Sequence, residues 1–230
     1  MHSSPTTRRP HLPRRAFACG LVSLAALSAC ANPRLFARNI RALSPNFTGS
    51  VPRSFTRDQV AQFSAASVEL HVGHGLPQLL LLTQLNGLDH LWGTRGQTIL
   101  QTRGARLIAT GGLAADLSGT QLVSADPAES SLLVANGAAC VRLLDFADSY
   151  GIGLRAESVF QVEGIETLEI LGARLETKRV VERVHVADIK WRHTNKFWID
   201  SKTGLVWLSQ QHAHPDIAAL TIKTLRPALA

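Results

Sequence analysis

The sequence predicts a mostly β fold, either a curled antiparallel sheet or a partly closed β-barrel, with a short helix on its N-terminal side. From residue 67 onward, short segments of alternating apolar and polar residues follow one another at regular spacing. Turn residues such as Asn86-Gly87 separate these segments, and residues 78–85 are apolar on both faces. Many short strands joined by tight turns are typical of an antiparallel sheet that curls or closes on itself.

Each element has its own local signal. Thr56-Arg57-Asp58-Gln59 matches a capping box, which predicts a helix over residues 57–63 with Thr56 as N-cap. A loop is expected over residues 111–127. The expected strands are Ser67–Val72 and residues 78–85, 88–94, 97–102, 106–110, 141–146, 154–162, 165–170, 174–186, 195–200, 205–211 and 217–225.

The segment 195–211 is expected to form a hairpin in the interior of the sheet, because both of its faces are apolar near the middle. A symmetric four-residue loop at 201–204 would place Asp200 opposite Leu205 and Trp198 opposite Trp207. Such a pair of indoles is either core or a flat platform for a sugar ring. The candidate contacts for a glycan or a protein partner are Trp92, Trp191, Trp198, Trp207, Asp200 and Gln210.

Residues 1–29 have the pattern of a secretory leader. A basic segment precedes an apolar run at 17–29, which is shorter than the roughly 20 residues of a membrane-spanning helix. The run ends at Leu27-Ser28-Ala29-Cys30. This resembles a bacterial lipobox, in which the cysteine thiol receives lipid before cleavage. An ordinary leader that ends at a cysteine by chance is the alternative, and Arg14-Arg15 leaves the twin-arginine export route open beside the general one.

The chain therefore divides into a leader (1–29), a lipid-anchored tether (30–53) and a single β-rich domain (54–230). Ala31 follows the cysteine where an aspartate would favour the inner membrane, by resemblance to lipoprotein sorting in Gram-negative bacteria. We expect a lipid anchor on Cys30 in the outer membrane, with the domain facing the periplasm.

Most of the formal net charge of +7 lies in the leader. Arg8, Arg9, Arg14 and Arg15 precede Cys30 without any acid, which leaves 20 basic and 17 acidic residues and a net charge of +3 in the mature chain. No nucleic-acid-binding motif accompanies this small excess, so no nucleic-acid partner is expected.

The sequence contains no motif of a catalytic or cofactor site. A serine elbow, a phosphate loop and a dinucleotide fingerprint are all absent. His212, His214 and Asp216 could share a strand face, but Pro215 interrupts that strand, so no metal site is expected. Cys140 lies in an apolar stretch that indicates a buried, structural thiol. We therefore predict no enzymatic activity and no cofactor.

Several motifs are similar to those of one family, over a region that runs from about Thr56 to Pro227. They include Thr56-Arg57-Asp58-Gln59, Gly75-Leu76-Pro77-Gln78, Thr102-Arg103-Gly104-Ala105-Arg106, Asp126-Pro127, Asn195-Lys196-Phe197-Trp198-Ile199-Asp200 and Thr203-Gly204-Leu205-Val206-Trp207-Leu208-Ser209-Gln210-Gln211. On these motifs the chain resembles the YjbF/GfcB-type outer-membrane lipoproteins of exopolysaccharide and group 4 capsule operons. Phe63-Ser64-Ala65 departs from the pattern expected there.

The resemblance implies a role in polysaccharide production or export, beside an outer-membrane barrel protein and other products of the operon. It carries over no catalytic residue. We predict a noncatalytic accessory lipoprotein that binds protein partners. A polysaccharide-binding module that uses its tryptophans is the alternative, and an enzyme acting on a glycan ranks behind both.

The lipobox generates the first testable prediction. Cys30→Ser removes the thiol that would carry the lipid, so the variant should accumulate as unprocessed or soluble protein. Membrane fractionation and the mass of the mature N-terminus measure this. Unchanged membrane association with normal cleavage would contradict a lipid anchor at this position.

Overall fold

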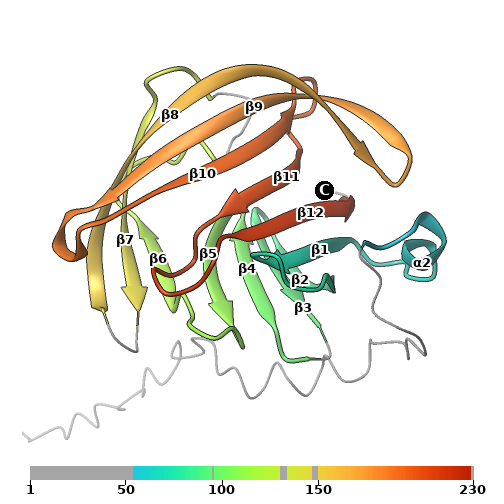
Figure 1. Cartoon of the computed structure of the whole chain (residues 1–230), viewed down its shortest axis with the longest axis horizontal. Coiled ribbons are helices and arrows are strands. Elements are labelled where there is room, and N and C mark those ends of the chain that lie inside the picture. Colours follow the sequence, from blue (N-terminus) through green and yellow to red (C-terminus); the bar gives the residue numbers. More distant parts are fainter. Residues whose placement is uncertain (1–53, 95, 130–133, 147–149, 229–230) are drawn as a thin grey trace, which may run out of the picture.

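A computed structural model describes residues 54–94, 96–129, 134–146 and 150–228 as one antiparallel sheet with one short α-helix (Figure 1). The predictions for the leader, for Cys30 and for the tether lie outside these residues. The strands are β1 (Ser67–Val72), β2 (Gln78–Asn86), β3 (Asp89–Gly93), β4 (Ile99–Arg103), β5 (Arg106–Gly111), β6 (Gly119–Leu122), β7 (Ala139–Phe146), β8 (Gly151–Ile170), β9 (Ala173–Val186), β10 (Trp191–Asp200), β11 (Val206–Gln211) and β12 (Leu220–Arg226).

The helix, α2 (Arg57–Ala61), begins with the expected capping box. Thr56 Oγ1 accepts a hydrogen bond from Gln59 N–H, and the Gln59 side chain accepts one from Thr56 N–H. The helix ends two residues earlier than predicted, at Ala61, with Gln62 as its C-cap. Within the part of the chain that the structure describes, no helix has the length and apolar character needed to cross a membrane.

The strand order is β5-β4-β3-β2-β1-β12-β11-β10-β9-β8-β7-β6. Strands that are neighbours in the sheet are therefore consecutive in the chain, except for β1 and β12. The two edge strands, β5 and β6, are consecutive in the chain. The connection between them bridges the remaining gap: Thr110 N–H donates to Leu117 O, and Ser118 N–H donates to Asp145 O on β7, both at 2.8 Å. The result is a nearly closed, barrel-shaped sheet (Figure 1), which confirms the predicted fold class.

The strand β10 begins at Trp191, earlier than the predicted residue 195, and two further elements differ in kind from the prediction. Residues 154–162 and 165–170 were expected as separate strands, but they belong to the single 20-residue strand β8. Gly164 adopts φ +142° at a shift in the pairing with β9, and this bulge absorbs the turn signal without ending the strand. The expected loop at 111–127 contains β6, which pairs with β7 but has only four residues, too few to show a period.

A buried arginine lies in the interior of this sheet. Arg106 donates from Nε to Asp126 Oδ2 at 2.6 Å and from Nη1 to Glu182 Oε2 at 2.8 Å. Arg142 Nη1 donates to Glu182 Oε1 at 2.6 Å, and Asn195 Nδ2 donates to Oε2 at 2.8 Å. The four charged side chains are at most 4% exposed, and their two positive and two negative charges balance. We refer to these five residues as the Arg106 network.

The network is ionised because its charges support one another. Burial opposes ionisation of Glu182, but the charges of Arg106 and Arg142 outweigh it and hold the pKa of the carboxyl well below its usual range. The same balance between burial and Arg106 lowers the pKa of Asp126. Burial likewise opposes the charge on Arg106, yet Glu182 and Asp126 raise the pKa of its guanidinium.

Gln211 on β11 forms a second link to β5 across the interior. Its Oε1 accepts from Leu107 N–H at 3.0 Å, and its Nε2 donates to Ala105 O at 2.9 Å and to Ser209 Oγ at 3.0 Å. The edge strand β5 is therefore fastened to the opposite wall by side chains.

Glu69 on β1 fastens the beginning of the domain. Its Oε2 accepts from Phe55 N–H and from Ser54 Oγ, both at 2.9 Å, and its Oε1 accepts from Lys223 Nζ on β12 at 2.6 Å. Burial opposes the charge of this carboxylate, but its hydrogen bonds with Lys223, Phe55 N–H and His71 outweigh burial and lower its pKa. The first described residues are thus tied to the pair of strands that joins the two halves of the sheet.

His193 on β10 lies beside the Arg106 network, and its ring stacks on Trp191 with the centroids 3.9 Å apart. Its Nδ1 is buried and has no hydrogen-bond partner among the described residues. Burial, with the positive charges of His212 and Arg142 adding to it, lowers the pKa of His193 to about 3. The folded imidazole therefore stays neutral at pH values where an unfolded one, with a pKa of about 6.5, takes up a proton.

This difference predicts that the folded protein loses stability as the pH falls from about 7 to about 5. The unfolded state binds a proton at His193 that the folded state does not bind, which lowers the free energy of unfolding by up to about 1.4 kcal/mol per pH unit. Urea unfolding at each pH measures it. His193→Gln should make the dependence of the unfolding free energy on pH shallower. A residual dependence should remain, because burial also lowers the pKa values of His90 and His212.

The exposed His74 provides a matched His→Gln control for the loss of an imidazole. A slope that is the same in His193→Gln as in the unsubstituted protein would contradict the role assigned to His193.

Candidate functional site

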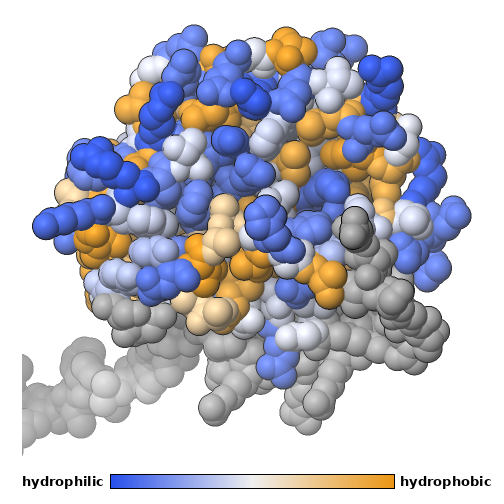
Figure 2. All heavy atoms as spheres, viewed as in Figure 1, coloured by the Kyte–Doolittle hydropathy of each residue, from blue (hydrophilic) through white to orange (hydrophobic). Residues whose placement is uncertain are grey.

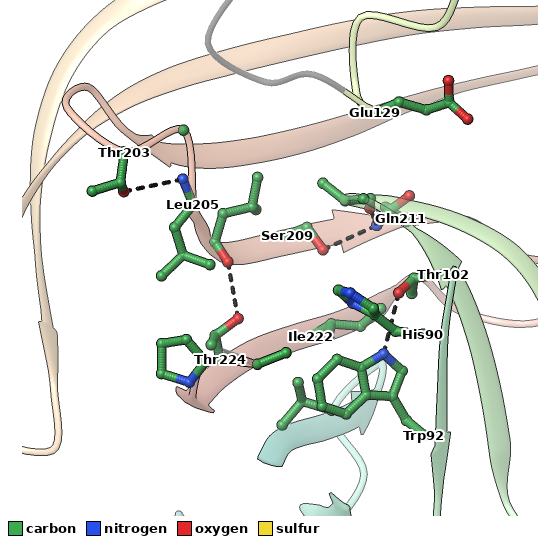
Figure 3. Close-up of a pocket in the computed structure, with 17 residues that line it drawn as sticks. His90, Trp92, Thr102, Glu129, Thr203, Leu205, Ser209, Gln211, Ile222 and Thr224 are labelled. Atoms are coloured by element: carbon green, nitrogen blue, oxygen red, sulfur yellow. Dashed lines mark hydrogen bonds between the residues drawn. The ribbon is translucent and has the colours of Figure 1, made fainter. Parts of the chain in front are cut away.

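A cavity between described residues lies inside the sheet and has a volume of about 300 Å³. Figure 3 shows it between β3 and β4 on one side and β11 and β12 on the other. Alternate residues of a strand share a face, so His90 and Trp92 on β3 and Ser209 and Gln211 on β11 all point inward. Its apolar lining includes Val68, Trp92, Leu205, Val206 and Ile222, and its polar lining is His90, Thr102, Glu129, Thr203, Ser209, Gln211 and Thr224.

Three hydroxyl groups in the lining keep a proton to donate. Thr102 Oγ1 accepts from the indole N–H of Trp92 at 3.1 Å, and Ser209 Oγ accepts from Gln211 Nε2. Thr203 Oγ1 accepts from Leu205 N–H at 3.2 Å. Among the described residues, none of these three hydroxyls donates a hydrogen bond, and a hydroxyl that accepts one bond still carries its own O–H donor. The cavity therefore offers hydrogen-bond donors beside its apolar wall.

Glu129 and His90 are the ionisable side chains in the cavity lining. Burial raises the pKa of Glu129, and Arg103 Nε, 3.7 Å from Oε1, only partly offsets it. Burial also lowers the pKa of His90, against the opposing charge of Asp89. The site therefore presents a neutral imidazole at neutral pH, and Glu129 shares its nearest cation, Arg103, with Asp89, which accepts from Arg103 at 2.7 Å and 3.0 Å.

The turn between β4 and β5 holds Glu129 in the cavity wall. Gly104 adopts φ +54°, and a Cβ at this position would lie 2.5 Å from Glu129 O, so the close approach requires glycine. Ala105 N–H donates to Ala128 O at 3.1 Å, and Asp126 Oδ1 accepts from Ala128 N–H at 2.8 Å. Asp126 belongs to the Arg106 network, which thereby also positions the cavity wall.

The structure distributes the four tryptophans over separate places. Trp92 is 6% exposed and lines the cavity, while Trp198 is 7% exposed and donates its indole N–H to Glu166 Oε2 at 2.9 Å. Trp191 is partly buried among aromatic and histidine rings. Trp207 is partly buried in an outer hollow of about 290 Å³ between α2, the β8–β9 turn and β12. The candidate contact residues therefore do not form one common site.

The expected pairing of Trp198 with Trp207 is wrong. Asp200 N–H does donate to Leu205 O at 2.8 Å, as the symmetric loop requires. However, Ile199 pairs with Val206 and Trp198 pairs with Leu208, so Trp207 is the extra residue of a β-bulge. A one-residue shift changes which side chains are neighbours, and the two indoles are not directly opposite each other.

Asp200 and Gln210 have structural contacts. Asp200 Oδ1 accepts from Lys202 N–H at 2.8 Å and from Thr203 N–H at 2.9 Å, which shapes the β10–β11 turn. Gln210 is partly buried and pairs with Lys196 on β10 and Thr221 on β12. Neither residue lines the cavity, whereas the neighbouring Gln211 does.

Cys140 is free and 1% exposed, and burial raises the pKa of its thiol, as expected for a structural cysteine. His214 and Asp216 approach to 3.8 Å, while His212 Nδ1 lies 3.4 Å from Asn195 Oδ1. No group of three or more possible metal-ligating side chains occurs within the described residues.

Among the predicted contact residues, Trp92 lines the cavity. None of the polar lining residues was predicted, namely His90, Thr102, Glu129, Thr203, Ser209, Gln211 and Thr224. The alternation of His90 with Trp92, and of Ser209 with Gln211, was a usable signal for a polar interior. Glu129 had no such signal, because it follows a loop whose position depends on a buried contact with Arg106.

The family described as group 4 capsule polysaccharide lipoprotein gfcB, YjbF matches residues 40–225. The chain belongs to this YjbF/GfcB family. Over 171 residues, this family member is 25% identical to the uncharacterized lipoprotein GfcB of Escherichia coli (strain K12), covering 74% of this chain and 80% of that protein. The resemblance predicted from the sequence motifs is thus confirmed.

A solved structure has the same fold. The crystal structure of the hypothetical lipoprotein YmcC from Escherichia coli (K12) superposes with a TM-score of 0.68 at 23% identity, covering 75% of this chain and 89% of that one. At this identity the similarity establishes the shared fold of the family member.

Proposed function

We propose that this YjbF/GfcB family member is a noncatalytic accessory lipoprotein of the outer membrane. In this proposal it assists the production or export of exopolysaccharide or group 4 capsule through protein partners. An outer-membrane barrel protein and other products of the export operon are the partners that we propose. Family membership carries the proposal, since the family is that of a capsule polysaccharide lipoprotein.

The chemistry of the cavity supports a noncatalytic role. Glycoside hydrolysis generally takes two carboxyl groups that flank the scissile bond. Glu129 is the single carboxylate in the described lining of the cavity, and the lining holds no cysteine beside its histidine. Neither a carboxylate pair nor a cysteine–histidine pair is therefore in place there.

The placement of the tryptophans favours contacts with proteins rather than a flat sugar platform on the surface. Trp92 and Trp198 are buried, and their indole N–H groups are bonded inside the domain. Figure 2 shows apolar residues interspersed with polar ones on the visible face, a composition that non-obligate protein interfaces share with ordinary protein surfaces. Polysaccharide binding remains the second candidate, favoured by the mixed polar and apolar lining of the cavity.

The proposal predicts that deletion of the gene lowers the amount of polysaccharide at the cell surface and that the lipidated protein restores it. A photoreactive amino acid at Val159, 51% exposed on β8, or at Leu76, 64% exposed in the β1–β2 turn, should crosslink to an outer-membrane protein from at least one position. Purified polysaccharide should keep its chain length when incubated with the protein.

Normal surface polysaccharide after deletion would refute the accessory role. Shortened or modified polysaccharide in the purified system would show instead that the protein is an enzyme. Complementation without a crosslinked protein from either position would count against action through protein partners.

A further inference from the structure

The cavity is larger than a packing defect. Protein interiors contain few voids larger than a water molecule, and a volume of about 300 Å³ lies at the lower end of the range of ligand pockets. The surrounding strands leave this space open, and contacts within the domain fix its walls. Trp92 is bonded to Thr102, Gln211 is bonded to β5, and Gly104 packs against Glu129. Such preorganised walls reduce the entropic cost of binding a ligand.

The two kinds of wall match a sugar ring. A pyranose has faces of C–H groups that pack on an aromatic ring, and a rim of hydroxyl groups that both donate and accept hydrogen bonds. The cavity lining includes Trp92 and aliphatic side chains as apolar surface. Between them it offers the O–H groups of Thr102 and Ser209 as donors and the carboxylate of Glu129 as an acceptor.

The charge of the lining selects among sugars. Lysine and arginine are absent from the described lining, while the carboxylate of Glu129 contributes a negative charge. Arg103 lies 3.7 Å from Glu129 but is already bonded to both oxygens of Asp89, so these three side chains together carry one net negative charge. A uronic acid would add a further carboxylate beside them, and like charges at short range repel. A neutral sugar meets no such repulsion.

We propose that the interior cavity binds one neutral sugar unit of a glycan. Among ligands of mixed polarity, the choice of a glycan rests on the proposed function. The inference deepens that function by naming a site and a substrate class. Trp92 supplies the stacking surface, Ser209 and Thr102 donate to sugar hydroxyls, and Glu129 accepts from a hydroxyl and repels acidic sugars.

Saturation-transfer NMR tests this with the full mature lipoprotein in nanodiscs at pH about 8. The probes are the methyl glycosides of glucose, galactose, mannose, N-acetylglucosamine and N-acetylgalactosamine, with methyl glucuronide and methyl galacturonide as matched acidic forms. At least one neutral glycoside should receive saturation, and methyl glucuronide and methyl galacturonide should each bind at least about tenfold more weakly than that neutral glycoside. Glu129→Gln should narrow that gap to about threefold, whereas Glu176→Gln, an exposed site on β9, should leave it unchanged.

Ser209→Ala is a conservative second variant that removes one donor from the cavity and should weaken the binding of neutral glycosides. It also removes an acceptor of Gln211 Nε2, so binding is measured well below the melting temperature of the variant. Absence of saturation transfer to every glycoside, or transfer to methyl decanoate alone, would overturn the proposal, the latter result indicating an acyl-chain site. Equal binding of neutral and acidic sugars would also overturn it. If no sugar binds but gene deletion still removes surface polysaccharide, the sugar site fails while the accessory function stands.

Discussion

A guanidinium group that is removed from water must be surrounded by acceptors and by opposite charge. Arg106 meets this requirement with four hydrogen bonds to Asp126 and Glu182. These partners lie 20 and 76 residues further along the chain, so the arginine can be satisfied only after the sheet has curled. The interaction therefore couples the open edge of the sheet, at β5, to the opposite wall at β9.

The same contacts determine what lies next to them. Asp126 organises the backbone at Ala128 and Glu129, and the turn at Gly104 fits against that backbone. Gln211 connects β11 to β5 and also lines the cavity. The side chains that hold the edge strand thus also shape the cavity for which a sugar ligand is proposed.

Local patterns predicted much of the fold and little of the site. Alternation and turn residues located most strands, since both depend on neighbouring residues, and the capping box at Thr56 was read directly. The bulge at Trp207 could not be read, because one added residue leaves the pattern of each strand intact while changing their register. Asp126 and Glu182 are ordinary surface residue types in the sequence. Their burial depends on Arg106 and Arg142, which only the folded chain brings together.

A double-mutant cycle on Arg106 and Glu182 tests this account most directly, with the free energy of unfolding measured in urea. Arg106→Met leaves the network with a net negative charge and Glu182→Gln leaves it with a net positive one, so each should cost about 3–5 kcal/mol. The double variant leaves Asp126 and Arg142 balanced. It should cost less than the sum of the single losses by about 2 kcal/mol or more. Additive losses would contradict the claim that this buried network holds the curled sheet together.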